Sequence, residues 1–220
     1  MTGQPTVTQQ VADPIRGDVS LLAEQIGSAE GLASLAPCAS WQSFEAVTDL
    51  ASLRRFLHDF RSQVLLPLEL PAICRAYQHA NRYEIRELLR LDCQMADLPL
   101  LQCFATASQR VGKTQLKRLR PLRDQRLVQR YIRAVEAGEA HAWHTLVYGL
   151  ILSLYSLPLR QGLLSYAQQT TRGLICSVAG RLHLAGCERG QLMDEVGSGF
   201  PAAIESALDS GEGKPRLLIL

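Results

Sequence analysis

The fold is decided by residues 144–186, which read HTLVYGLILSLYSLPLRQGLLSYAQQTTRGLICSVAGRLHLAG. On both sides of Pro158, apolar residues recur every three or four positions, a period typical of helices with one buried face. After the proline the period persists for about seven turns, through Leu159, Leu163, Tyr166, Thr170, Leu174, Val178 and Leu182. The stretch therefore predicts two helices, of which the second is long and central.

The most apolar part of this stretch, residues 146–159, is too short to cross a membrane. It spans about 14 residues, whereas a transmembrane helix needs about 20. Polar or helix-breaking residues also interrupt it, namely Tyr148, Ser153, Tyr155, Ser156 and Pro158. The run predicts a buried core helix, and we expect no membrane partner.

The preceding sequence carries several more helical patterns. Leu50, Leu53, Leu57, Phe60 and Val64 lie on one helix face, after a cap at Thr48 or Asp49. Further helices are predicted over 69–80, 83–95, 97–112, 116–135 with a break at Pro121, and 191–208. Pro67 is expected to end or kink the first helix, and the helix over 97–112 is expected to end near Gly112. No alternating strand pattern is present, so the sequence predicts an all-α, single-domain bundle of about eight or nine helices.

This bundle is expected to cover residues 18–208, because the two ends of the chain have a different composition. Residues 1–17 are rich in Gln, Thr, Pro and Gly and predict a disordered tail, and residues 209–220 predict a flexible one. The first residues are polar, unlike a secretory leader. None of the six cysteines forms a CxxC pair. We therefore expect a cytoplasmic protein with reduced thiols.

A strongly basic stretch runs from residue 110 to residue 133. It holds nine basic residues and one acid, Asp124, in a chain whose net charge is only +2; the basic residues are Arg110, Lys113, Lys117, Arg118, Arg120, Arg123, Arg126, Arg130 and Arg133. Such a stretch is either a docking surface for an acidic partner or a solvated helix face. Tyr131 is its only aromatic residue, which disfavours nucleic acid, because base stacking usually uses several.

Two histidines, His141 and His144, lie three residues apart near a predicted helix start. This spacing can place both imidazoles on one face, and neutral histidine is a common ligand of nickel and zinc. The alternative is one surface histidine and one histidine packed at a helix terminus. Two ligands do not hold a metal tightly, so the pair predicts at most a transiently bound nickel or zinc ion and no tightly bound cofactor.

The sequence contains no recognisable catalytic motif. There is no GxSxG elbow, and the Gly-Lys-Thr at residues 112–114 lacks the upstream glycine of a phosphate loop, because Ala107 stands at that position. No paired carboxylates stand out either. We therefore expect a protein that is not an enzyme, although a helical enzyme or ligand carrier with a pocket between helices is an alternative.

Three blocks of sequence resemble the F-type urease accessory proteins, the UreF family. The most specific contains His144, the run Val147-Tyr148-Gly149-Leu150, Leu157-Pro158, Tyr166 and Arg181-Leu182. The second contains residues 107–112 with Leu116 and Leu119, and the third contains Glu45, residues 53–57, Leu68-Glu69-Leu70-Pro71 and Tyr77. Together they extend from about residue 45 to residue 208, about three quarters of the chain.

The resemblance implies a nickel-insertion chaperone made only of helices. Such proteins form homodimers, bind a second accessory protein of the D or H type, and recruit a nickel-carrying GTPase of the G type to apo-urease. The partner-binding residues expected on this basis, together with the basic stretch, are Glu45, Arg110, Arg123, Arg126, Arg130, Tyr166 and Arg181.

The chain departs from the family pattern at both ends. Residues 35–45 retain only Phe44 and Glu45 of the usual N-terminal segment, and residues 183–187 replace the usual Pro-Leu-Gly-Gln turn. Residues 209–220 replace the usual C-terminal segment. These segments contribute to dimer and partner contacts in the family, so a second interpretation is an interaction module that has lost the nickel role.

Overall fold

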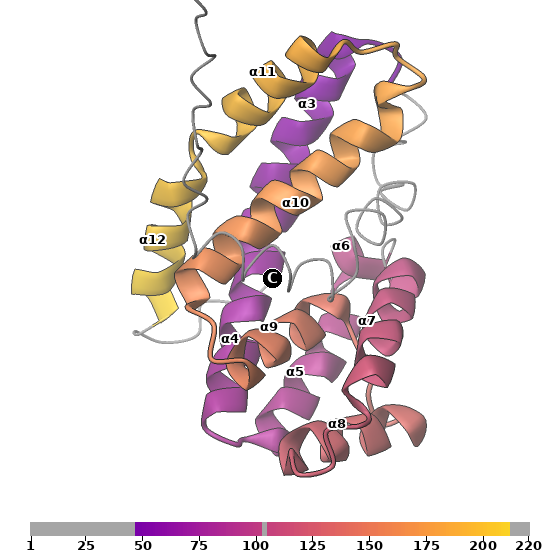
Figure 1. The fold of residues 1–220 in the computed structure, drawn as a ribbon, viewed down its shortest axis with the longest axis vertical. Helices are drawn as coiled ribbons and strands as arrows, with labels where there is room; N and C mark the ends of the chain where they lie inside the picture. Colours follow the sequence, from indigo (N-terminus) through magenta and orange to yellow (C-terminus); the bar gives the residue numbers. More distant parts are fainter. Residues whose placement is uncertain (1–46, 103–104, 212–220) are drawn as a thin grey trace, which may run out of the picture.

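The computed structural model describes residues 47–102 and 105–211, and this part of the chain is all-α, with no strand among the described residues (Figure 1). The prediction of a single all-helical domain is therefore confirmed. The predicted tail at 1–17, the expected partner residue Glu45 and the last nine residues of the chain, 212–220, lie outside the described residues.

The first three elements follow one another without a break, as α3 (Leu50–Phe60), η3 (Arg61–Glu69) and α4 (Leu70–Asn81). Asp49 caps α3 by accepting the Ser52 backbone N–H at 2.7 Å, as one of the two predicted caps. Pro67 does not end the helix, because it lies in η3, a π-helical segment. The wider π turn accommodates a proline ring that would clash with a carbonyl in an α-helix.

The next four helices form the lower right of Figure 1. They are α5 (Ile85–Ala96), the short α6 (Pro99–Gln102), α7 (Ala105–Leu119) and α8 (Arg126–Glu136). The break predicted at Pro121 is present between α7 and α8. The predicted end near Gly112 is wrong, because α7 continues to Leu119. Gly112 is buried against the backbone carbonyl of Ala142, so this glycine allows two segments to approach closely within the bundle.

The centre of the bundle is α9 (His144–Leu154), which is buried on nearly all sides. It packs most extensively against α4 and then against α7. Gly149 allows the α4 contact, because a β-carbon there would lie 2.6 Å from the Ile73 carbonyl oxygen. The long helix predicted after Pro158 is present as α10 (Leu159–Ala179), which runs diagonally across Figure 1.

The last two helices, α11 (Gly186–Gly197) and α12 (Phe200–Gly211), pack against α10. A single helix over 191–208 was predicted, and the structure divides it at Ser198 and Gly199. Gly199 lies against the Arg61 guanidinium, which also stacks 5.7 Å from the Phe200 ring centroid. None of the helices in the described ranges has the length and apolarity needed to span a bilayer.

Candidate functional site

A buried carboxylate fixes the loop that leads into α9. Asp92 of α5 has no exposed surface and accepts three hydrogen bonds. Its donors are the Tyr131 hydroxyl at 2.5 Å and the backbone N–H groups of His141 and Ala142 at 2.6 and 3.0 Å. Ala142 is held in the left-handed region with φ of 62°, which is costly for a residue with a side chain. The Asp92 carboxylate therefore determines the path of the chain up to His144.

His144 begins α9 and joins three helices through a buried chain of hydrogen bonds. Its Nδ1 lies 2.8 Å from the Ser108 hydroxyl of α7, and its Nε2 lies 2.6 Å from the Tyr166 hydroxyl of α10. The Ser108 hydroxyl already accepts the His144 backbone N–H at 3.2 Å. We therefore assign its proton to the bond with Nδ1, which leaves the ring proton on Nε2 to be donated to Tyr166.

A buried carboxyl group, that of Glu69 at the end of η3, lies beside this chain of hydrogen bonds. Glu69 is 5% exposed and interacts electrostatically with Tyr166. Burial raises the pKa of Glu69 to about 7, and the Tyr166 hydroxyl opposes this rise. The Glu69 Oε2 atom has no hydrogen-bond partner within the described part of the chain. Ser108, His144 and Tyr166, from α7, α9 and α10, thus form one directional network, which we call the His144 network, and Glu69 of η3 lies beside it.

The His144 network keeps its histidine neutral. Burial lowers the pKa of His144 to about 3, and both ring nitrogens have hydrogen-bond partners. A metal ion could bind His144 only by displacing Ser108 or Tyr166. Across residues 47–102 and 105–211 no group of three or more His, Cys, Asp and Glu residues is arranged to hold a metal. The predicted ligand role of His141 and His144 remains a prediction, and the geometry gives His144 a structural role.

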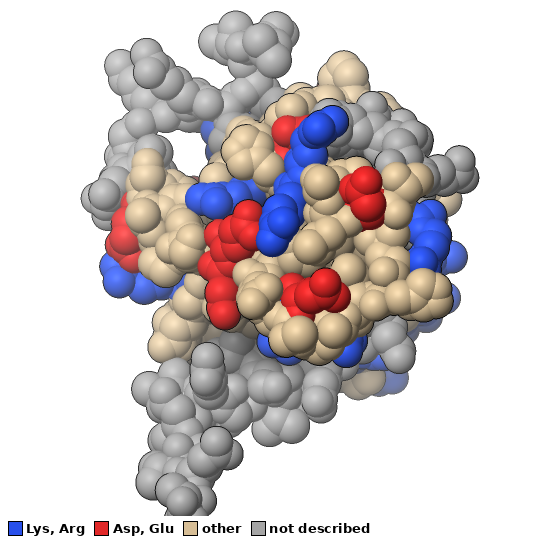
Figure 2. Space-filling view, turned by 90° about the horizontal axis from the view of Figure 1, so that it is seen from above, with Lys and Arg blue, Asp and Glu red and all other residues tan. Residues whose placement is uncertain are grey.

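The predicted basic stretch lies on the surface of α7, α8 and their connection. All nine of its basic side chains are exposed, while Leu116, Leu119, Leu127, Val128 and Ile132 face the core. Arg120 is paired with Glu136. The opposite end of the molecule differs, because Figure 2 shows acidic and basic side chains intermixed at the end that carries α3 and α11. There Arg54 pairs with Glu195 at 2.9 Å. The α7–α8 surface therefore carries mainly positive charge.

The remaining predicted partner residues have different environments. Arg110, Arg123, Arg126 and Arg130 lie on the exposed α7–α8 surface. Arg181 is exposed after the end of α10 and donates to the Val47 carbonyl at 2.9 Å, so it ties the start of the described chain to this helix. Tyr166 is only 1% exposed and belongs to the His144 network. Its place in the core makes direct contact with a partner impossible while the bundle is intact.

The comparison with family models decides the affiliation of the chain. The UreF model matches residues 47–193, more than half of the 220 residues. The chain belongs to the UreF family. Membership of this family implies the role of a urease accessory protein. A comparison with curated proteins gives no match.

The UreF match covers the Asp92 loop, the His144 network and the α7–α8 surface, and it ends within α11. Sequence reasoning missed the buried roles of Glu69, Asp92 and Ser108. A usable signal existed for two of them, because Glu69 has Leu65 and Ile73 four residues away, and Asp92 has Leu88 and Met95 four and three residues away. An acid that shares a helix face with apolar residues is a candidate for burial with partners.

Proposed function

We propose that this UreF-family chain is a scaffold for nickel insertion into urease in the cytoplasm. In this proposal it pairs as a homodimer, binds an accessory protein of the D or H type, and recruits a nickel-carrying GTPase of the G type to apo-urease. The observation that carries the proposal is the exposed α7–α8 basic surface on a rigid bundle. A surface of one charge sign steers an acidic partner into place and fixes its orientation.

The physical work of such a scaffold is presentation of surfaces. The Asp92 contacts and the His144 network support this role, because they connect α5 with α8, and α7 with α9 and α10, through buried hydrogen bonds. Buried polar networks with satisfied partners rigidify a core. Nickel is the cargo of the assembly in this proposal, and no cofactor is bound tightly by the chain itself.

The basic surface makes the first prediction. Replacing Arg123, Arg126 and Arg130 with Glu should abolish co-purification with the partner accessory proteins, because six units of charge change where the partner is held. The fold should remain intact, since all three side chains are exposed and lie away from the core. Far-ultraviolet circular dichroism and thermal unfolding check the fold, and a pull-down at low and at physiological salt checks binding.

A matched control reverses three exposed arginines on other helices, Arg55, Arg172 and Arg189. It changes the net charge by the same amount and should leave co-purification unchanged. If both triple variants lose the partners equally, net charge and not this surface is responsible. If the α7–α8 variant still co-purifies, the assignment of the surface is wrong.

A further inference from the structure

The turn between α4 and α5 carries a tyrosine in a conformation that favours glycine. Tyr83 has φ of 57°, its N–H donates to the Ala80 carbonyl at 3.1 Å, and the next N–H, of Glu84, donates to the His79 carbonyl at 2.9 Å. These two bonds define a helix C-terminal motif whose left-handed position is usually glycine. The end of α8 uses the same motif with Gly138 at φ of 78°. The turns after α9 and α10 use the motif with Ser156 and His183, so Tyr83 is one of three residues with a side chain that bear this conformational cost.

Packing of the Tyr83 side chain does not offset this conformational cost. It is 75% exposed, more than any other large apolar side chain in the described ranges. A second exposed tyrosine, Tyr155, follows the end of α9 and is 45% exposed. Asn81 and Ser153 join these two helix ends through a side-chain hydrogen bond of 2.7 Å. Both tyrosines thus belong to one end of the fold, and a strained, exposed aromatic residue at that end points to a contact outside the chain.

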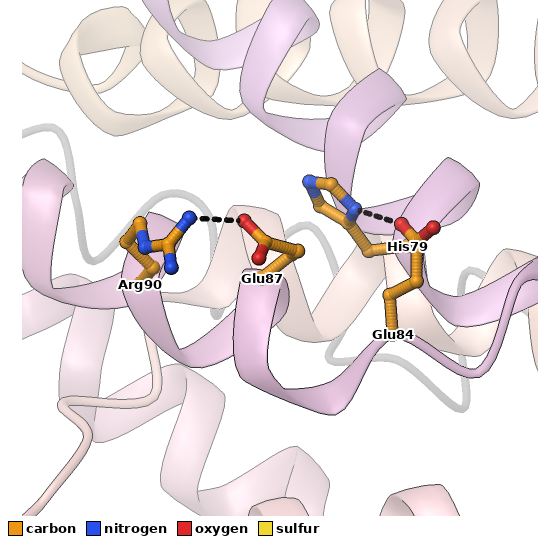
Figure 3. A network of polar contacts seen from close by, with 4 residues as sticks. All are labelled: His79, Glu84, Glu87 and Arg90. Atoms are coloured by element: carbon orange, nitrogen blue, oxygen red, sulfur yellow. Dashed lines mark hydrogen bonds and ion pairs between the residues drawn. The ribbon is translucent and has the colours of Figure 1, made fainter.

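The charged groups around Tyr83 leave this end positive. Figure 3 shows that both nearby carboxylates are engaged: Glu84 contacts His79 Nδ1 at 2.8 Å, and Glu87 contacts Arg90 at 2.7 Å. Arg82 and Arg86 flank the tyrosine, are exposed, and form no ion pair with any described residue. An incoming acidic group therefore finds two arginines without carboxylate partners beside an aromatic ring.

We propose that the α4–α5 turn docks an acidic segment of a partner protein, with Tyr83 as the apolar anchor and Arg82 and Arg86 as the charge contacts. Tyrosine and arginine are the residue types that dominate binding energy at protein interfaces. The partner segment carries an aromatic or aliphatic side chain among Asp and Glu residues. Single-stranded nucleic acid, whose bases usually stack on several aromatic side chains and whose backbone binds a longer basic track, is the alternative that the test below distinguishes. This surface is separate from the α7–α8 basic surface and does not rest on the role of that surface.

The test uses the full chain and a fluorescein-labelled acidic peptide with a single central Phe. We expect saturable fluorescence anisotropy that weakens with salt. Two peptides provide controls, one with the Phe changed to Ala and one with the acids changed to Lys, and both should bind at least about tenfold more weakly. A labelled oligothymidine of similar length tests the nucleic-acid alternative and should bind more weakly than the acidic peptide.

Two protein variants locate the site. Tyr83→Gly should weaken peptide binding at least about tenfold without lowering the Tm, because glycine adopts this turn without steric cost. Arg82→Glu with Arg86→Glu should also abolish binding, whereas the matched Arg55→Glu with Arg189→Glu should not. No saturable binding, unchanged affinity in Tyr83→Gly, equal affinity for the Ala peptide, or tighter binding of oligothymidine would each overturn the proposal.

Discussion

Replacing Asp92 with Ala is expected to lower the free energy of unfolding by about 4 kcal/mol, because each buried donor left without its acceptor costs about 1–3 kcal/mol. The substitution leaves the Tyr131 hydroxyl and the N–H groups of His141 and Ala142 without their acceptor. It also releases the loop that holds Ala142 in the left-handed region. Chemical denaturation monitored by circular dichroism measures the loss.

Two further variants separate the contributions at this position. Tyr131→Phe removes one of the three donors and should cost about 1 kcal/mol, the net worth of one hydrogen bond. Asp194→Ala, at an exposed position on α11, should change stability by less than about 0.5 kcal/mol. The role given to Asp92 would be refuted if Asp92→Ala were as stable as Asp194→Ala.

The second large effect is an opposing pH dependence of stability from Glu69 and His144. The ordinary pKa of glutamate is 4.5, and burial raises that of Glu69 to about 7. Between these values the folded protein holds a proton that the unfolded chain has lost. The stability contributed by Glu69 is therefore full below pH 4.5 and is lost as the pH rises to about 7.

His144 acts in the opposite direction. Its ordinary pKa is 6.5, and burial lowers it to about 3. Between these values the unfolded chain binds a proton that the folded protein does not hold. Its contribution is full above pH 6.5 and is lost as the pH falls towards about 3. Between pH 4.5 and 6.5, Glu69 therefore lowers the free energy of unfolding as the pH rises, and His144 raises it.

Single substitutions separate the pH dependence due to Glu69 from that due to His144. In Glu69→Gln the free energy of unfolding should rise with pH more steeply than in the wild type, by about 1.4 kcal/mol per unit across this window. In His144→Gln it should fall with pH relative to the wild type by a similar amount. Urea denaturation at a series of pH values measures both. Glu139→Gln, at an exposed position, is the control and should run parallel to the wild type. Parallel profiles for all three variants would exclude the proposed protonation states.

Periodicity predicted the helices whose burial follows a simple stripe. The long helix after Pro158 is present as α10, and the exposed arginines of α8 alternate with core residues as their spacing indicated. These predictions succeeded because the spacing of apolar residues that marks the buried face of a helix can be read from the local sequence. The basic surface was readable for the same reason, since long charged side chains remain on the outside of a bundle.

The features that could not be predicted from the sequence depend on contacts between residues far apart in the chain. Gly112 resembled a helix end, but the approach of Ala142 from the α8–α9 loop makes it an interior position. The sequence did not show that Ser108 and Tyr166, from two other helices, form hydrogen bonds with both ring nitrogens of His144. Tyr83 gave no signal, because its left-handed conformation arises from the geometry of the turn and not from its side chain.

The most direct test of the account is restoration of urease activity. The chain is expressed with the urease subunits and the other accessory proteins of its own source, in cells that lack an F-type protein. We predict nickel-dependent urease activity with the wild-type chain and little with the Arg123→Glu, Arg126→Glu and Arg130→Glu variant. If the wild-type chain is folded and abundant but urease remains inactive, the scaffold role is wrong. The chain is then an interaction module that keeps only the UreF fold.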